Sequence, residues 1–349
     1  MGARRTLILL YAYKAYPGSE PVSPEFVPTP VPLTQDTYYG NSIWGDYYVT
    51  VAKRWLEAGY VNEVKGIAIR YPKDHPRYSP AGLMRITEGF DFYILEHIGH
   101  YRSIHQPSPH DVLFIRGQPP WEPIVGLHPS SFKIFYCARP AGDWKPRYPV
   151  DAILTDDPSW SIPGVRCVEM IKCCDEEIFQ PLGLEKTYDV CFVARFERRS
   201  QKGQLQFAWI ADKRWRTVFV GEHADPTVVA TLRWRWPSCE ILGHVTKARV
   251  NEILNRSRVS IVFTRAAEVG TRVILESLAA GTPVVIHKRN MGRKYVTPRA
   301  GEAAGSLLFR WKVAKAIRQF DRYGARAEYE RRYSSRKVAC ELWERLGLK

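Results

Sequence analysis

The chain of 349 residues is long enough to form two hydrophobic cores. Its composition, 45% hydrophobic and 25% charged, is typical of a folded globular protein and excludes a disordered one. No apolar run in the sequence approaches the roughly 20 residues that a membrane-spanning helix needs, and the net charge of +15 favours an anionic ligand or partner.

The positive charge is concentrated in the second half of the chain. Residues 1–178 contain 18 Lys and Arg against 20 Asp and Glu, whereas the remaining residues contain 33 against 16. We therefore expect the second half to attract the anion. Nucleic acid, an anionic membrane surface and a phosphate-bearing small molecule all fit this charge.

The first half predicts strands that alternate with helices. Thr6–Tyr13 is an apolar run typical of a buried strand, and the proline-rich residues 16–34 predict an extended loop. Residues 45–60 have helical spacing. Short β-type runs follow within residues 64–71, 111–117, 131–138 and 150–157. Runs that are apolar on both faces and joined by helix-length connections predict a parallel sheet covered on both sides.

The second half repeats this pattern. Strands are predicted at residues 188–196, 216–222, 239–245, 259–265 and 282–288, with helices at 204–213, 248–257 and 271–280, and charged helices from residue 311 onward. The periodicity is interrupted at residues 173–189. We therefore expect an α/β chain of two doubly wound domains, residues 1–180 and 181–330, followed by a C-terminal helix at 331–349. Such domains bind ligands at the carboxyl ends of their strands.

Two glutamates flank a predicted helix start after the strand at residues 259–265. Glu268 lies just before the helix, and Glu276 lies about 8–9 Å further along its axis. The unpaired amides of a helix start bind phosphate, and Gly270 lets the backbone approach a ligand closely. Carboxylates are poor phosphate ligands but good acceptors for hydroxyl groups. A molecule with a diphosphate between two hydroxylated ends, such as a nucleotide sugar, fits this pattern.

The segment "EVGTRVILESLAAGTPVV" resembles the signature of family 4 glycosyltransferases, which have the GT-B fold. The segment "YDVCFVARFERRSQKG" is similar to the element that opens the nucleotide-binding domain of that family, and the likeness covers roughly residues 188–320. The resemblance implies two Rossmann-like domains that face each other across a cleft. The first would bind the acceptor, the second would bind the nucleotide sugar, and the last helix would pack back on the first domain.

The resemblance also implies a reaction and a site. The enzyme would be a retaining hexosyltransferase that moves a sugar from a nucleoside-diphosphate sugar to an acceptor hydroxyl without a cofactor or a metal ion. The acceptor would be a glycan, a protein or a lipid-linked molecule. The implied catalytic residues are Glu268, Arg195 and Lys202, and the implied donor-binding residues are Glu276, Gly270, Thr271, Arg272, Arg195 and Lys202. The two cations would hold the diphosphate, Glu276 the ribose, and Glu268 the sugar hydroxyls.

The sequence also departs from the family pattern. Val269 follows the first glutamate where a glycine is common, and Ala194 precedes Arg195 where the family has a glycine. The loop after residues 111–115 carries Arg116 and Gln118 but not the histidine that many members have there. Two alternatives therefore stay open: a non-catalytic relative that binds a glycan or a nucleotide, and, less favoured, a basic protein that binds nucleic acid.

The cysteines and histidines complete the expectations. Seven cysteines without regular spacing predict free thiols and a reducing, cytoplasmic location. No CxxC or HExxH pattern occurs, so no structural zinc site is expected. His97, His100, His105 and His110 are interpreted as surface or loop residues, with His97 or His100 as a less favoured acceptor-side group. The basic C-terminal helices are interpreted as a solvated face, and contact with an anionic membrane is the alternative.

Overall fold

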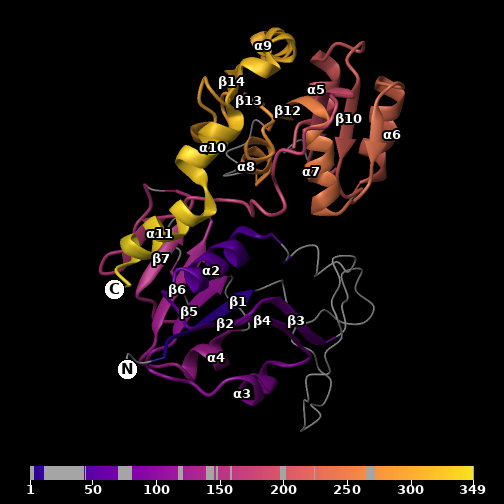
Figure 1. Ribbon diagram of the computed structural model, residues 1–349. Coiled ribbons are helices and arrows are strands. Elements are labelled where there is room, and N and C mark those ends of the chain that lie inside the picture. Colours follow the sequence, from indigo (N-terminus) through magenta and orange to yellow (C-terminus); the bar gives the residue numbers. More distant parts are fainter. Residues whose placement is uncertain are drawn as a thin grey trace. The chain divides into compact units, whose positions relative to one another are not determined.

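The computed structural model of the chain describes residues 4–11, 43, 45–69, 81–116, 121–138, 145–146, 148–157, 159–196, 202–223, 225–264 and 272–348. The chain divides into two compact units (Figure 1). Unit 1 consists of residues 1–171 together with 338–349, and unit 2 consists of residues 172–337.

Unit 1 is built on an eight-stranded sheet with the order β3-β4-β2-β1-β5-β6-β7-β8. The strands are β1 (Thr6–Tyr11), β2 (Glu63–Ile69), β3 (Gly82–Thr87), β4 (Phe90–Leu95), β5 (Val112–Arg116), β6 (Phe132–Cys137), β7 (Ala152–Thr155) and β8 (Arg166–Glu169). All neighbouring strands are parallel except β3 and β4, which form an antiparallel hairpin at one edge. All six residues of β1 are buried, as expected for a central strand covered on both faces.

The helices of unit 1 include α2 (Tyr47–Glu57), α3 (Tyr101–Ile104) and α4 (Glu122–Gly126), with a short 3-10 helix η1 (Ile98–His100) before α3. The side chain of Asp46 caps the start of α2 by accepting a hydrogen bond from the Tyr48 amide, at 3.1 Å. The helix then buries its aromatic and aliphatic side chains against the sheet, with Trp55 fully covered.

The last helix, α11 (Ser335–Leu346), carries the chain back into unit 1. The Trp55 indole donates a hydrogen bond of 2.8 Å to the carbonyl of Ala339, and the Arg166 guanidinium donates one to the carbonyl of Leu346. The ring of Trp343 stacks on Tyr60, with centroids 4.9 Å apart. Residues 338–349 are therefore an integral part of the core of unit 1.

Unit 2 is built on a six-stranded, all-parallel sheet with the order β11-β10-β9-β12-β13-β14. The strands are β9 (Tyr188–Val193), β10 (Thr217–Val220), β11 (Glu240–Leu242), β12 (Ser257–Val262), β13 (Val284–His287) and β14 (Gly301–Ala304). Its helices are α5 (Gln204–Ile210), α6 (Pro226–Arg235), α7 (Lys247–Asn255), α8 (Arg272–Ala279), α9 (Ser306–Arg318) and α10 (Ala325–Tyr333), with 3-10 turns η2 (Met291–Tyr295) and η3 (Phe320–Arg322).

An aromatic cluster fills the core of unit 2. The ring of Phe207 on α5 lies within 6.5 Å of Phe219 on β10 and within 6.3 Å of Phe309 on α9. Phe263, at the end of β12, packs edge-on against Phe309 with centroids 4.5 Å apart. Two helices, α5 and α9, are thereby packed against the sheet near the end of β12.

Residues 172–180 belong to unit 2. The sequence had predicted a domain boundary at residue 180, which would have placed them in the first domain. The hydroxyl of Tyr329 on α10 donates a hydrogen bond of 3.1 Å to the carbonyl of Cys174, and the Gln180 amide donates one of 3.3 Å to the side chain of Asn251 on α7. These bonds tie the connecting segment to the helices of unit 2.

All seven cysteines of the chain are free thiols. Among the described residues, no helix has both the length and the apolar composition that crossing a bilayer requires.

Candidate functional site

The order of strands in unit 2 creates a natural ligand-binding edge. The chain runs outward from β9 through β10 to β11, and then returns to place β12 on the opposite side of β9. The carboxyl ends of β9 and β12 are therefore the topological switch point, where parallel α/β sheets open a crevice for ligands. Arg195 follows β9, and Thr264 follows β12.

The backbone carbonyls of Arg195 and Lys202 accept hydrogen bonds that hold both residues at this edge. The side-chain amide of Gln204, the first residue of α5, donates to the carbonyl of Arg195 at 2.8 Å. The hydroxyl of Thr264 donates to the carbonyl of Lys202 at 3.5 Å. The two cationic residues that the sequence predicted as diphosphate ligands thus both lie on the loop that follows β9, and Lys202 lies beside the end of β12.

Glu222, which follows β10, holds the side chain of Arg195. One carboxylate oxygen lies 3.1 Å from Arg195 Nε, and both side chains are about two-fifths exposed. This ion pair was not predicted from the sequence, because it joins two strands that are neighbours only in the folded sheet. It leaves the guanidinium at the solvent-facing edge, where an anionic ligand can reach it.

Gly203 explains why the loop before α5 lies so close to β12. Its φ of 78° is in the left-handed region, and a Cβ at this position would lie 2.8 Å from the carbonyl oxygen of Phe263. Any other residue here would clash with the backbone of Phe263, and its own backbone would be strained by the positive φ. Glycine is therefore required for Lys202 to be presented beside the end of β12.

The substitution Gly203→Ala is expected to lower the free energy of unfolding of unit 2 by about 2 kcal/mol and to weaken donor binding, because it moves Lys202. The matched control is Gly126→Ala on α4, where a Cβ would meet nothing within 4 Å. Urea unfolding followed by circular dichroism measures the difference. Equal stability of the two variants would contradict this account of the loop.

Glu276 and Arg272 both lie on α8, which packs against β12 and β13. Glu276 is half-buried and Arg272 is exposed. Burial raises the pKa of the Cys174 thiol, and the carboxylate of Glu276 reinforces the effect. The Cys174 thiol lies 3.6 Å from the carbonyl of Leu275, so α8 contacts the segment that opens unit 2. Glu268, Gly270 and Thr271 lie outside the described residues, so their positions remain predictions from the sequence.

Unit 1 has its own switch point, between β1 and β5, with a polar cluster at the carboxyl ends of these strands. The Tyr11 hydroxyl donates a hydrogen bond of 3.0 Å to Asp46. The guanidinium carbon of Arg116 lies 4.7 Å from the ring centroids of both Tyr11 and Tyr48. In the sequence analysis, Arg116 belongs to the run where many members of the resembled family have a histidine.

The charge of Arg116 is only partly balanced in this cluster. Its Nη1 atom lies 4.0 Å from the Asp46 carboxylate and is buried, and it makes no hydrogen bond to any part of the chain that the structure describes. Two aromatic faces hold the guanidinium in place. The arrangement therefore offers an unused hydrogen-bond donor at the ligand-binding edge of unit 1.

Comparison with known proteins finds a family match for the unit 2 edge. Residues 187–319 match the family model described as "Glycosyl transferases group 1". No curated protein matches the sequence. The match covers the β9 edge, α5 and α8, and hence the described residues of the predicted donor site.

Solved glycosyltransferase structures share the fold of the whole chain. AviGT4, a glycosyltransferase of avilamycin A biosynthesis, is 15% identical and has a TM-score of 0.64, over 98% of this chain and 97% of that one. Sucrose-phosphate synthase from Thermosynechococcus elongatus is 11% identical and has a TM-score of 0.67, over 98% of both chains. Alr3699/HepE from Anabaena, solved with UDP-glucose, is 12% identical and has a TM-score of 0.61, over 98% and 99%. The predicted α/β fold with two Rossmann-like domains of the GT-B type is confirmed, and the domain match supports a glycosyltransferase.

Proposed function

We propose that the protein is a retaining hexosyltransferase that moves a sugar from a nucleoside-diphosphate sugar to an acceptor hydroxyl. The proposal is supported by the position of Arg195 and Lys202 on the loop that follows β9, with Lys202 beside the end of β12. This loop lies within the segment that matches group 1 glycosyl transferases. Two cations at a topological switch point form a site for a diphosphate.

The chemistry follows from the charge that develops on the leaving group. As the bond between the sugar and the diphosphate breaks, negative charge builds on the departing nucleoside diphosphate. The side chains of Arg195 and Lys202 would stabilise that charge, which is the task that a metal ion performs in other transferases. We therefore propose that transfer needs no metal ion in the donor site.

The remaining predicted residues complete the donor site in this proposal. Glu276 on α8 would accept hydrogen bonds from the ribose hydroxyls, and Glu268 would accept them from the sugar. Gly270, Thr271 and Arg272 would line the diphosphate. Alr3699/HepE, which shares the fold, has been solved with UDP and with UDP-glucose, which supports a nucleotide sugar as the donor.

The acceptor would bind at the β1 and β5 edge of unit 1, where the partly exposed guanidinium of Arg116 would donate to an acceptor oxygen. Glycans, proteins and lipid-linked molecules all present such oxygens. The many aromatic side chains at this edge, including Tyr47, Tyr48 and Tyr136, form a rigid wall behind the guanidinium.

The substitution Arg116→Gln is expected to lower kcat/KM for the acceptor by about tenfold to a hundredfold, the equivalent of one hydrogen bond from a charged group. The donor dissociation constant should not change, because donor binding belongs to unit 2. The matched control is Arg85→Gln. Arg85 lies on the edge strand β3, and the change removes its exposed ion pair with Asp91. Loss of donor binding, or full activity, in Arg116→Gln would contradict the acceptor assignment.

The activity itself is tested with a panel of UDP-, GDP- and ADP-sugars. We expect slow hydrolysis of one of them without acceptor, transfer to a matching acceptor with retention of the anomeric configuration by NMR, and no stimulation by added Mg²⁺ or Mn²⁺. Binding of one nucleotide without hydrolysis or transfer would instead identify the non-catalytic relative. Absence of both binding and turnover would reject the proposal.

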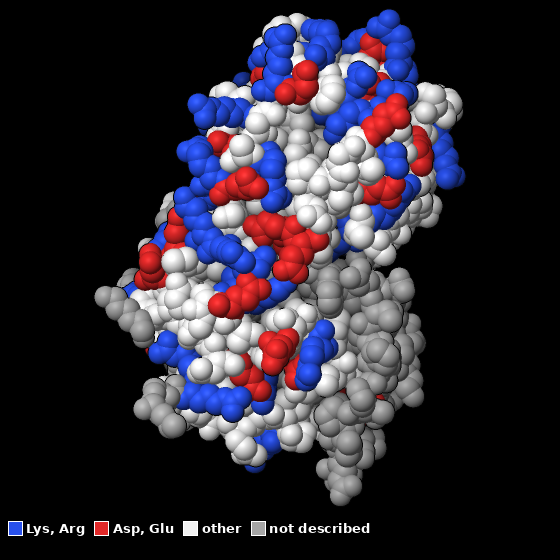
Figure 2. Space-filling view, in the orientation of Figure 1, with Lys and Arg blue, Asp and Glu red and all other residues white. Residues whose placement is uncertain are grey.

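The charge distribution favours a small anion over nucleic acid. Figure 2 shows, in the upper part of the view, Lys and Arg side chains of unit 2 interspersed with Asp and Glu side chains. Glu302 pairs with Lys312 and Lys315, at 2.7 and 2.6 Å. Asp212 likewise pairs with Arg214 and Arg310, at 2.7 and 2.9 Å. Part of the positive charge is thus balanced locally, unlike the continuous basic face that a polyanion requires.

A further inference from the structure

A second cluster of chemically active side chains lies at the opposite, amino-terminal edge of the unit 1 sheet. Asp111 immediately precedes β5, and Ser131 immediately precedes the neighbouring strand β6, with which β5 is paired in register from Val112 onward. His105 follows α3, and His128 lies in the loop between α4 and β6. The cluster lies at the amino-terminal end of β5, whereas Arg116 lies at its carboxyl end.

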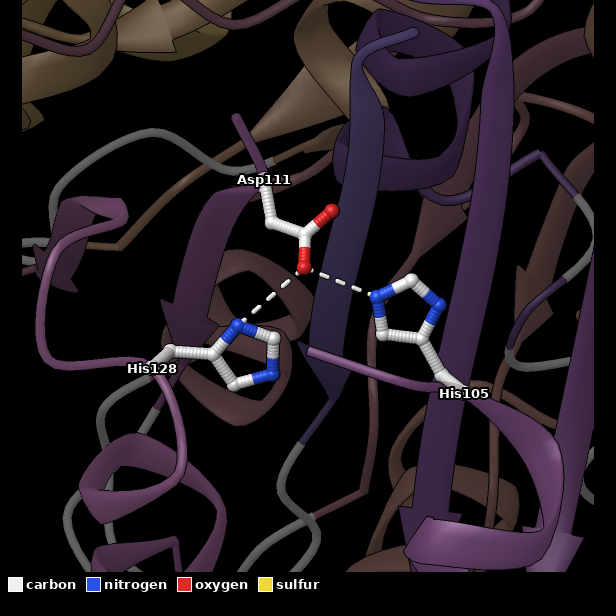
Figure 3. Close-up of side chains that lie close together, drawn as sticks. All are labelled: His105, Asp111 and His128. Atoms are coloured by element: carbon white, nitrogen blue, oxygen red, sulfur yellow. Dashed lines mark hydrogen bonds and ion pairs between the residues drawn. The ribbon is translucent and has the colours of Figure 1, made fainter. Parts of the chain in front are cut away.

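The two imidazole rings converge on one carboxylate oxygen (Figure 3). Asp111 Oδ2 lies 2.8 Å from His105 Nε2 and 3.2 Å from His128 Nδ1. The rings are parallel to within 3°, with centroids 5.9 Å apart. All three ligand-type atoms lie within 4.8 Å of one another, so one ion could contact all of them.

The three side chains are buried. His105, which the sequence predicted as a surface or loop residue, lies in a loop but is not at the surface. The side chains of His105, Asp111 and His128 are 8%, 1% and 0% exposed. Among the described residues, the ion pairs of Asp111 are with these two histidines and not with Lys or Arg. A carboxylate taken out of water is stabilised by a compensating positive charge, which a bound metal ion supplies.

The separations fit a tetrahedral zinc ion. At zinc–ligand bonds of about 2.0–2.1 Å, neighbouring ligand atoms lie about 3.3 Å apart. The pair of His128 and Asp111, at 3.2 Å, already has this spacing. The pair of His105 and Asp111, at 2.8 Å, needs to open by about 0.5 Å to reach it. Two imidazole nitrogens and a carboxylate oxygen are a ligand set that Zn²⁺ accepts.

The surroundings orient the ligands as the outer shell of a metal site does. His128 Nε2 lies 2.7 Å from the Tyr101 hydroxyl, so this nitrogen can donate while Nδ1 faces the ion. The amide of Ser108 donates to Asp111 Oδ2 at 2.7 Å. The hydroxyl of Ser131 lies 3.2 Å from His128 Nδ1 and supplies a further oxygen beside the ligands.

We infer that His105, Asp111 and His128 form a structural Zn²⁺ site in unit 1. The ion balances the buried carboxylate and links the turn before β5 to the loop before β6. The site is closed to solvent and lies at the edge opposite the proposed acceptor edge, so its contribution is to stability and not to sugar transfer. This inference does not depend on the proposed function.

The sequence missed this site because its spacing matches no common zinc pattern. Five residues separate His105 from Asp111, and the third ligand, His128, is contributed by a different loop. The four histidines that the sequence grouped together, between residues 96 and 110, include only one of the ligands. Only the pairing of β5 with β6 brings the two loops together.

The test uses the full chain, stripped of metal with a chelator and then titrated with Co²⁺ alone. We expect one equivalent of Co²⁺ to give the visible absorption bands of a tetrahedral site, and one equivalent of Zn²⁺ to abolish them. Zn²⁺ should also raise the melting temperature of the stripped protein, because it binds the folded state only. Absence of tetrahedral bands in the unmodified, folded chain, or no change in melting temperature, overturns the inference.

Substitutions of the proposed ligands test whether a bound ion lies at this cluster. Asp111→Asn and His128→Gln are expected to abolish the Co²⁺ bands, whereas His110→Gln, an exposed histidine of the same loop, should keep them. Far-UV circular dichroism shows whether each variant is folded. Because the unmodified chain gives the primary result, a variant that fails to fold does not decide the outcome. Retention of the bands in folded Asp111→Asn and His128→Gln would place the ion elsewhere and overturn the assignment.

Discussion

Replacing Lys202 with alanine is expected to lower kcat/KM for sugar transfer by about a hundredfold, a loss comparable to removal of one preorganised donor from a developing anion. Lys202 is presented at the end of β12 by the left-handed Gly203 and by the hydrogen bond that Thr264 donates to its carbonyl. Among the described residues of this loop, Arg195 is the other cation. Arg195→Ala is expected to cause a loss of the same order.

The measurement is a steady-state assay with the donor that the nucleotide-sugar panel identifies. The matched control is Lys337→Ala, which removes an exposed lysine of unit 2 near the start of α11. Circular dichroism of each variant should match that of the unmodified chain, because both lysines lie outside the hydrophobic core. Activity of Lys202→Ala equal to that of Lys337→Ala would remove Lys202 from the site.

Replacing Trp343 with alanine is expected to lower the free energy of unfolding of unit 1 by about 3–5 kcal/mol. The indole is 5% exposed and lies against two aromatic rings: it stacks on Tyr60 at 4.9 Å and meets Trp55 edge-on at 5.1 Å. The loss has two parts, the transfer of a large apolar side chain and the cavity that it leaves. It would show that the last helix is part of the folding unit formed by residues 1–171.

The control for this prediction is Trp311→Ala on α9, where the indole is 57% exposed. That change is expected to stay within about 0.5 kcal/mol. Because the chain has two units, unfolding in urea is followed both by circular dichroism and by tryptophan fluorescence, and the transitions are assigned separately. A Trp343→Ala protein as stable as the control would show that α11 contributes little to unit 1.

The central strands could be predicted from sequence because burial on both faces leaves a continuous apolar run. β1 and β9 lie within the predicted ranges, and β12 overlaps its predicted range at residues 259–262 but begins two residues earlier. β9 and β12 are interior strands of an all-parallel sheet. Edge elements carry no such signal. β14 reads Gly-Glu-Ala-Ala and forms a strand only because β13 offers a partner, which local sequence does not show.

Two elements had readable signals that the sequence interpretation did not use. Helix α6 begins after Asp225, whose side chain accepts from the Thr227 amide, with Pro226 in the first turn. That is a strong helix-start pattern. The hairpin of β3 and β4 turns at Glu88 and Gly89, where Gly89 has a φ of 73°.

The site was partly predictable for a similar reason. Lys202 was implied by the resemblance of residues 188–203 to a family element, and the structure gives the glycine that follows it the left-handed conformation. Glu222 and Gln204 could not be assigned their roles, because each acts on Arg195 across the sheet edge. His105 and His128 lie in loops that only strand pairing brings together. Glu268, Gly270 and Thr271 remain predictions.

The central claim is that a nucleoside diphosphate binds against the β9 and β12 ends of unit 2. Isothermal titration of the full chain with UDP, GDP and ADP tests it most directly. We predict that one of these nucleotides binds at one site per chain, and that Lys202→Ala and Arg195→Ala each weaken that binding severalfold or more. If none of the three binds, or if the nucleotide binds both variants as tightly as the unmodified chain, the diphosphate does not lie where we place it.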